Sequence, residues 1–359
     1  MRTPEVILRD TGWDDLEHAY GPASDAPAQL SALLSEDEEA CGDALGFLDA
    51  AMLHQGSVYS ATLPAAEFVA AVLDDRRVGV PCESALPWDG GERPLRAALL
   101  EWLGSFAESL TWDDEDDEED EDDDPWVAGR ALLPGLFDRV APFLDDTGPA
   151  VRQAATGAVA HLLQADELAG RRADVADRLL RAAKDASPVE RAGIALSLGG
   201  WGIPALLTDE HPGVRACAAV TTAYDDDPAA LTEVRLALRD PAAADDLLGE
   251  QPPQLEGKLR FQLIKALLRR TTEFDEIVDE AVAVARMTNE YTVDADWGPL
   301  LHRAFRGGPA DRLSESQRRF LTAVVDNDRC WGSIANRMLW LRRAGLPADR
   351  DGLRALLQA

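Results

Sequence analysis

The side chains best suited to catalysis or metal binding are scattered along this chain. Its five histidines never stand three or four residues apart, so the sequence contains neither HExxH nor His-x-His, and a zinc site is not expected. A nucleophile elbow, GxSxG, and a phosphate loop, GxxxxGK(S/T), are also missing from the sequence. These patterns predict no catalytic, cofactor-binding or metal-binding residue.

The most conspicuous charged feature is a run of twelve acidic residues, Asp113–Asp124, with Trp112 before it and Trp126 after it. The run lacks the central glycine and the spaced ligands of a calcium loop. Because like charges repel, we expect a disordered, solvated loop. The alternative is an electrostatic lure for a basic protein, in which Asp116 and Asp120 supply charge and the two tryptophans serve as anchors.

A second candidate site surrounds His54 in the stretch LHQGSVY. His54, Gln55 and Ser57 are expected at a helix end, where they and Tyr59 could face a groove and contact a partner. The plainer interpretation is a capping and turn segment. An enzyme would require His54, Tyr59 and nearby acids to converge in one polar pocket.

The charge of the chain narrows its possible partners. Among 359 residues there are 66 acids and 35 bases, which gives a net charge of −31. Such a surface repels the phosphates of nucleic acids and of anionic membranes, which bind by neutralisation with Lys and Arg. We therefore expect a protein partner with a basic surface, and neither nucleic acid nor membrane.

The N-terminal sequence and the spacing of the cysteines predict the cellular location of the protein and the redox state of its thiols. The first residues, MRTPEVILRDTGWDD, lack the apolar region of a signal peptide, and no stretch reaches the ~20 apolar residues of a membrane span. Both observations favour a cytoplasmic protein. Cys41, Cys82, Cys217 and Cys330 are isolated in the sequence, so we expect buried, reduced thiols.

Helical periodicity dominates the chain, and strand patterns are scarce. In PLRAALLEWLGSFAESL, apolar residues recur every three or four positions and form one stripe: Leu95, Leu99, Trp102, Leu103 and Phe106. Similar segments, each expected to be about 12–18 residues long, are separated by Pro-, Gly- or Asp-rich breaks. The sequence therefore predicts an all-α fold.

Three of these helix starts share the pattern D-x-x-P-x-x-R followed by small residues. The stretches are DTGPAVRQAA, DASPVERAGI and DEHPGVRACA, and their arginines lie 39 and 24 residues apart. Self-similarity at about 40 residues built from helix pairs is typical of a helical solenoid.

The pattern D-x-x-P-x-V-R-x-A-A resembles the start of the second helix in HEAT repeats of bacterial type. The first and third stretches match it closely, whereas the second has its valine shifted. The resemblance implies a right-handed α-solenoid of HEAT-like helix pairs, a fold that mostly serves as a binding scaffold. It also implies a structural ladder of acid–guanidinium contacts between repeats, made by Asp146, Arg152, Asp185, Arg191, Asp209 and Arg215.

We therefore expect an N-terminal helical region at 1–110, an acidic low-complexity loop at 111–126 and a HEAT-like repeat region at 127–359, all within one continuous solenoid.

The expected function is non-catalytic protein binding through a concave, acidic surface, with an immunity or antitoxin-like role as its sharper form. The alternative is a HEAT-like enzyme, of lyase or glycosylase type, with a polar pocket in the groove. The sequence leaves the oligomeric state open.

Overall fold

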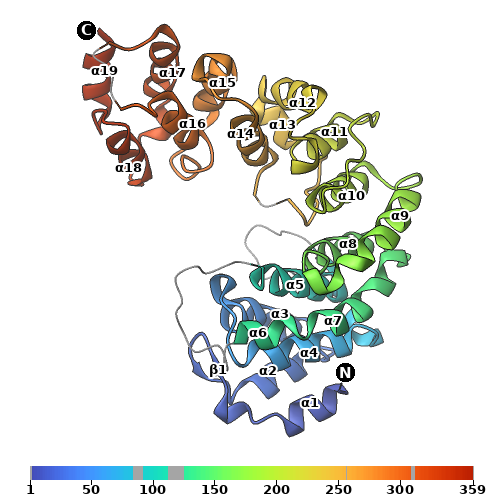
Figure 1. The fold of residues 1–359 in the computed structure, drawn as a ribbon. Helices are drawn as coiled ribbons and strands as arrows, with labels where there is room; N and C mark the ends of the chain where they lie inside the picture. The colour runs from blue at the N-terminus through green and yellow to red at the C-terminus, as the bar shows by residue number, and fades with distance from the viewer. Residues whose placement is uncertain (1, 84–91, 112–124, 256, 309–311, 359) are drawn as a thin grey trace. The chain divides into compact units, whose positions relative to one another are not determined.

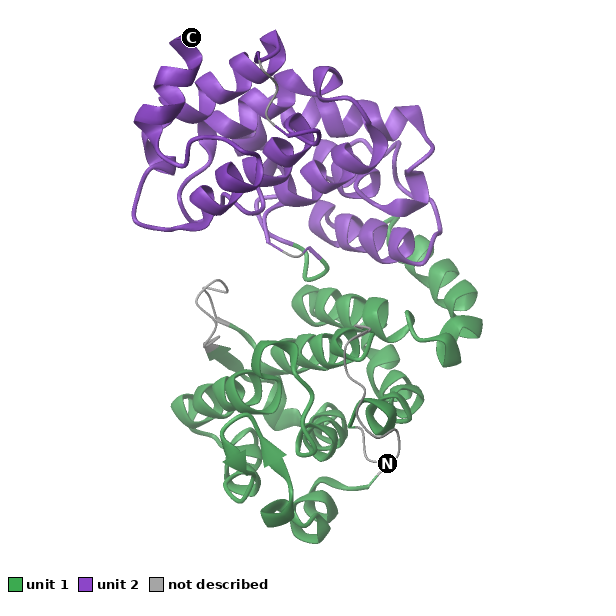
Figure 2. Ribbon diagram, turned by 60° about the vertical axis from the view of Figure 1, so that its left-hand side comes forward, with its two compact units in different colours: residues 1–185, 252–254 green, residues 186–251, 255–359 purple. Residues whose placement is uncertain are grey.

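The structure, a computed structural model, describes residues 2–83, 92–111, 125–255, 257–308 and 312–358. The fold is all-α, as predicted, and it divides into two compact units (Figure 2). Unit 1 comprises Met1–Asp185 with Pro252–Gln254, and unit 2 comprises Ala186–Gln251 with Leu255–Ala359. The expected acidic loop at 111–126 falls within unit 1, and its residues Trp112, Asp116 and Asp120 lie outside the described residues.

Unit 1 is built from short helices and two small antiparallel strand pairs (Figure 1). Its helices are α1 (Pro4–Asp10), α2 (Ala26–Ala32), α3 (Glu38–Phe47), α4 (Thr62–Val72), α5 (Leu95–Ser109), α6 (Pro125–Arg130), α7 (Leu133–Val140), α8 (Pro149–Leu162) and α9 (Arg172–Ala182). The strands are β1 (Glu17–His18) with β2 (Gly21–Pro22), and β3 (Pro81–Glu83) with β4 (Glu92–Pro94). A π-helical turn, Leu48–Met52, extends α3.

The core of unit 1 is centred on α5, which packs along α8. The predicted apolar stripe of α5 is confirmed, since each of its five members is buried. Gly104 allows α8 to approach closely, because a Cβ at this position would lie 3.0 Å from the Cα of Ala158.

Unit 2 is a succession of helices in which each one packs on a neighbour close in sequence. The helices are α10 (Pro188–Gly200), α11 (Pro212–Ala219), α12 (Pro228–Leu238), α13 (Pro241–Asp245), α14 (Leu259–Arg270), α15 (Val278–Met287), α16 (Trp297–Ala304), α17 (Glu315–Asp326), α18 (Asn336–Arg343) and α19 (Arg350–Gln358). One series of contacts runs through α12, α15, α17 and α19, and a second runs through α11, α14, α16 and α18.

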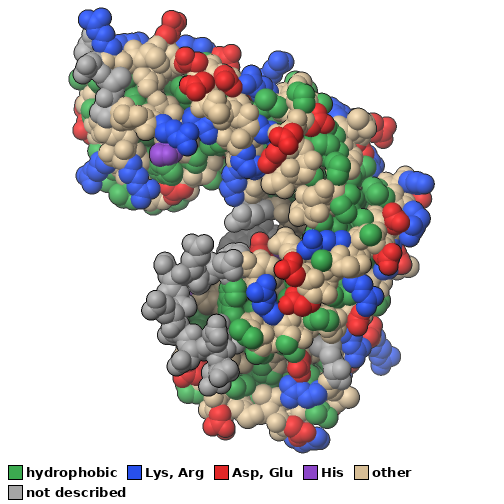
Figure 3. Space-filling view, viewed as in Figure 1, with side chains coloured by type: hydrophobic (Ala, Val, Ile, Leu, Met, Phe, Trp, Pro, Cys, Tyr) green, Lys and Arg blue, Asp and Glu red, His purple; other side chains and the backbone are tan. Residues whose placement is uncertain are grey.

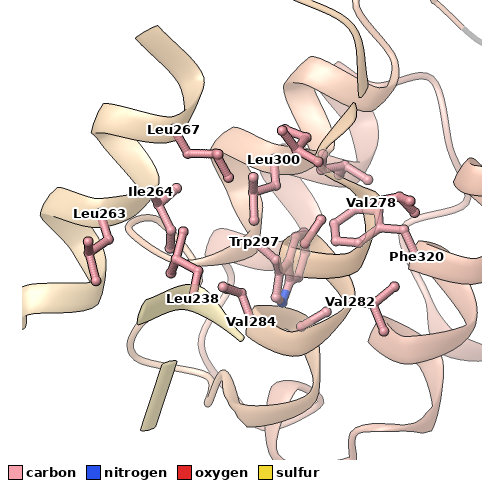
Figure 4. Close-up of a cluster of buried hydrophobic side chains, with 14 of the residues drawn as sticks. Leu238, Leu263, Ile264, Leu267, Val278, Val282, Val284, Trp297, Leu300 and Phe320 are labelled. Carbon is pink, nitrogen blue, oxygen red and sulfur yellow. The ribbon is translucent and has the colours of Figure 1, made fainter. Parts of the chain in front are cut away.

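The core of unit 2 lies between these two series (Figure 4). Trp297 is fully buried at its centre among leucine and valine side chains, and its indole N–H donates to the Sγ of Cys330 at 3.4 Å. All four cysteines are free and buried, so the predicted burial is confirmed. Across the described part of the chain, no helix combines the length and the apolar character that a bilayer span requires.

The predicted helix starts are largely correct. Proline occupies the first turn of α8, α10, α11, α12 and α13, where its fixed φ is compatible with a helix and its missing N–H costs nothing. The predicted length of about 12–18 residues is wrong for many helices, since α11 has 8 residues and α13 has 5. Helix α11 ends before two threonines, Thr221 and Thr222, and α13 ends shortly before the stretch GEQPP, so each helix stops earlier than its apolar periodicity suggests.

Candidate functional site

An exposed tyrosine marks the tip of the first hairpin. Strands β1 and β2 pair Glu17 with Pro22 and His18 with Gly21, so Ala19 and Tyr20 form the turn. Gly21 has φ +119°, a conformation that glycine adopts without steric cost. The Tyr20 side chain projects into solvent and is 68% exposed, which is unusual for a large aromatic residue.

Two histidines hold the Tyr20 ring in place. His18 is buried at the base of the turn, where its Nδ1 accepts a hydrogen bond from the backbone N–H of Tyr20 at 3.1 Å. With Nδ1 as acceptor, the neutral ring carries its proton on Nε2, which donates to the Asp25 carboxylate at 3.1 Å. The His18 and His54 rings meet the Tyr20 ring edge-on, at centroid distances of 6.2 and 5.7 Å.

The hairpin is fixed to the helices beneath it on both sides. The N–H of Ala19 donates to the carbonyl of Ala51 in the π-helical turn, and the N–H of Ala61 donates to the carbonyl of Glu17, both at 3.0 Å. The N–H of Glu17 also donates to Ser60 Oγ at 2.9 Å. The turn is therefore a rigid support for its exposed tyrosine, which lowers the entropic cost of binding through that side chain.

An irregular backbone positions His54. The π-helical turn Leu48–Met52 is followed by a short 3₁₀ turn, and there Gln55 has φ +53°. A non-glycine residue in the left-handed region is uncommon, and π-helical turns frequently occur at functional sites. His54 lies half-buried, with Nδ1 at 3.1 Å from the carbonyl of Ala50, and its ring edge faces Tyr20.

The surroundings of this cluster carry a strong negative charge. Residues 10–75 include 14 acids and neither a lysine nor an arginine. Asp14, Asp15, Glu17 and Asp25 are all exposed and lie within six residues of Tyr20 in the sequence. We name Tyr20, His18, His54 and Asp25 the Tyr20 cluster. It combines an aromatic anchor with a field that attracts cations.

A carboxyl group with an altered titration lies in the same π-helical turn. Burial of Asp49, together with the nearby negative charge of Glu101, raises the pKa of its carboxyl to about 6, although Arg93 opposes the shift. Arg93 and Glu101 form a two-pronged ion pair with N–O distances of 2.7 and 2.5 Å. Asp49 can therefore exchange a proton near neutral pH. The alternative that the protein is a HEAT-like enzyme stays a prediction.

The other residues predicted to bind a partner are placed as follows. Tyr59 is half-buried, and its backbone N–H donates to Thr62 Oγ1 at 2.8 Å. Trp126 is half-buried at the start of α6. Of the predicted set, the structure thus brings His54 into edge-on ring contact with Tyr20, whereas Tyr59 contacts Thr62.

The three repeated arginines have the same local geometry. Nη1 of Arg152, Arg191 and Arg215 donates to a backbone carbonyl five or six residues earlier, at 2.8–2.9 Å, just before the helix that carries the arginine. Each arginine therefore fastens the loop in front of its own helix. The other two nitrogens of each guanidinium group, Nε and Nη2, can hydrogen-bond a neighbouring element.

The two of these arginines that belong to unit 2, Arg191 and Arg215, bind acidic residues 18 positions further along the chain. Arg191 forks onto Asp209 at 2.8 and 3.0 Å, and Arg215 Nε donates to Glu233 at 3.1 Å. Burial has the largest single influence and raises the pKa of Asp209, but the hydrogen bonds from Arg191 and from the backbone N–H of His211, together with the charge of Arg191, outweigh burial and lower the pKa. Asp185 ends unit 1, where its N–H donates to the carbonyl of Ala182.

Neither a metal-binding group in the described part of the chain nor a similar known protein points to a function. Within the described residues, no group of three or more His, Cys, Asp or Glu side chains could hold a metal ion. Comparisons with protein-family models, with curated proteins and with solved structures found no match to this chain.

Sequence reasoning identified His54 but not His18, Tyr20 or Asp25. Two signals were present: the turn sequence HAYGP, which places an aromatic residue before a glycine, and the absence of Lys and Arg from residues 10–75. Neither signal states that His54, 34 positions after Tyr20, contacts the turn.

Proposed function

We propose that this protein is a non-catalytic binding scaffold whose unit 1 captures a protein with a basic surface. The observation that carries the proposal is the Tyr20 cluster: a rigidly held tyrosine, 68% exposed, in a stretch of 66 residues without Lys or Arg. Aromatic side chains that are pre-positioned in this way are typical anchors of protein interfaces.

The charge of unit 1 supports a basic partner. Residues 1–185 contain 40 acids and 14 bases, whereas residues 186–359 contain 26 acids and 21 bases. An excess of one sign speeds the encounter with a partner of the opposite sign, and this acceleration falls as salt screens the charges. An immunity or antitoxin-like role, in which an acidic protein neutralises a basic toxin, would use this acceleration.

We further propose that the helices form HEAT-like repeats. The two series of contacts in unit 2 support this arrangement, together with the Arg191–Asp209 pair, from α10 to the loop before α11, and the Arg215–Glu233 pair, from α11 to α12. Repeats of this type contact their immediate neighbours and leave long faces available for a partner.

Site-specific photo-crosslinking tests the proposed function. A photoreactive phenylalanine at position 20 should trap one basic protein in the native cell, because Tyr20 would lie within the interface. The matched control is the same residue at position 236, since Leu236 is 48% exposed but belongs to α12 in unit 2.

Binding to the trapped partner gives the quantitative test. Tyr20→Ala should weaken binding by about 30-fold, the loss typical of an interface anchor, whereas Tyr20→Phe should retain most of it because the ring remains. Association should also slow as salt rises. The same adducts at positions 20 and 236, or a trapped protein with an acidic surface, would contradict the proposal.

A further inference from the structure

The charge of the chain is distributed unevenly, and its last part is basic. Residues 297–359 contain eleven arginines and six acids, whereas residues 1–296 contain 24 bases and 60 acids. A local net charge of +5 in a protein of net charge −31 indicates that this end attracts a different kind of ligand from unit 1.

Helix α18 presents an exposed face that is both apolar and cationic. Of its eight residues, Leu341 is buried, whereas Leu339 is 50% exposed and Arg342 and Arg343 are exposed. Residues three and four positions apart share one face of a helix, so Arg342 and Arg343 lie on the same face as Leu339, one turn further along α18. Among the described residues, neither arginine forms an ion pair.

This face is held in a fixed position by the loop before α16. The indole N–H of Trp340 donates to the Asp294 carboxylate at 2.7 Å, and the side chain of Asn336 donates to the same carboxylate. The guanidinium of Arg343 lies over the Trp340 ring, 5.8 Å from its centroid. Arg343 is therefore ordered before any ligand arrives, which reduces the entropic cost of binding.

The same loop adds a second exposed apolar side chain. Tyr291 is 75% exposed, and the adjacent Glu290 accepts a hydrogen bond from the backbone N–H of Ile334 at 3.0 Å, two residues before α18 begins. On the face drawn in Figure 3, Lys and Arg side chains border apolar ones at the end of unit 2 where α18 and α19 lie.

We propose that Tyr291, Leu339, Arg342 and Arg343, here named the α18 surface, dock an acidic protein segment that carries an apolar residue. The arginines would fork onto its carboxylates, and Leu339 with Tyr291 would cover its apolar side chain. A protein segment fits better than a nucleic acid, because Leu339 offers no ring for base stacking and the rest of the chain repels a long polyphosphate.

A defined acidic peptide provides the probe. The peptide TWDDEDDEEDEDDDPW, which has the sequence of residues 111–126, combines carboxylates with two tryptophans. Its binding is measured by fluorescence anisotropy with the full chain and with a chain in which residues 113–124 are replaced by a Gly-Ser linker. The replacement excludes competition from the chain's own acidic run.

The decisive variant changes the apolar and the cationic part of the α18 surface together. Leu339→Ser with Arg342→Glu should weaken peptide binding at least 10-fold. The matched control is Leu236→Ser with Arg239→Glu at the C-terminal end of α12, where a leucine 48% exposed also precedes an exposed arginine, the C-cap residue, by three positions. Unchanged circular dichroism and melting temperature confirm that both double variants fold.

The outcomes separate the proposal from its alternatives. Peptide binding that is lost in the α18 variant and kept in the α12 variant supports it. Lack of binding to either form of the chain, equal loss in both variants, or tighter binding of an oligonucleotide of equal charge would overturn it. A failure here leaves the proposed function intact, since that proposal depends on Tyr20 in unit 1.

Discussion

Replacing Asp49 by asparagine should stabilise unit 1 at neutral pH and have little effect in acid. The folded structure raises the pKa of this carboxyl from its ordinary value of 3.8 to about 6, chiefly through burial and next through the charge of Glu101. The folded chain therefore binds the Asp49 proton more tightly than the unfolded chain does. Asparagine resembles the protonated carboxyl in size and remains neutral at every pH.

The sign of the effect follows from linkage between protonation and folding. A carboxyl whose pKa is raised on folding costs no stability below pH 3.8, and the cost grows as pH rises from 3.8 through about 6. At about 1.36 kcal/mol per pKa unit, the full cost above pH 6 is about 3 kcal/mol. Asp49→Asn should recover about 1–3 kcal/mol at pH 7.5 and close to nothing at pH 4.

Urea unfolding at several pH values, followed by hydrogen exchange in peptides from residues 38–110, measures this difference within unit 1. The control is Asp43→Asn, because Asp43 is an exposed acid on α3, the helix that the π-helical turn carrying Asp49 extends. Its effect on stability should depend little on pH. If Asp49→Asn changed stability equally at pH 4 and pH 7.5, or lowered it at pH 7.5, the inferred burial of a titrating carboxyl would be incorrect.

Two further predictions concern unit 2. Arg260→Ala should lower the free energy of unfolding of unit 2 by about 3–5 kcal/mol. Arg260 is 4% exposed, and its loss leaves the buried carboxylates of Asp245 and Asp296 unpaired. A loss below about 1 kcal/mol in urea unfolding would contradict this prediction. Gly199→Ala should lower the free energy of unfolding by about 1–3 kcal/mol, because the added Cβ would lie 2.3 Å from the Thr221 side chain. Thermal unfolding of the double variant with Thr221→Ala should show that part of this stability is recovered.

Local patterns gave much of the fold. The buried stripe of α5, from Leu95 to Phe106, and the proline starts of α8, α10 and α11 follow from interactions within a few residues, which periodicity and capping describe well. Helix lengths were less predictable, because several short helices end at breaks that interrupt an otherwise continuous pattern.

Partners across longer separations were predicted less completely. The repeated sequence pattern identified Arg191 and Asp209, and the structure places them in a two-pronged ion pair. The same pattern did not identify Glu233 as the partner of Arg215, because Glu233 lies within α12 and outside the repeated motif. Which acid an arginine reaches depends on how two helices cross, and the motif contains no information on that angle.

The sequence by itself determined that this protein is helical, strongly acidic and free of the familiar catalytic motifs, because these properties reside in composition and in short-range periodicity. The tertiary structure decided that His54 contacts Tyr20 across 34 positions, that Asp49 is half-buried near Glu101, and that Leu339 stays exposed on the same helix face as two arginines. Each of these facts depends on how segments distant in the sequence pack together, and packing is settled by the whole chain.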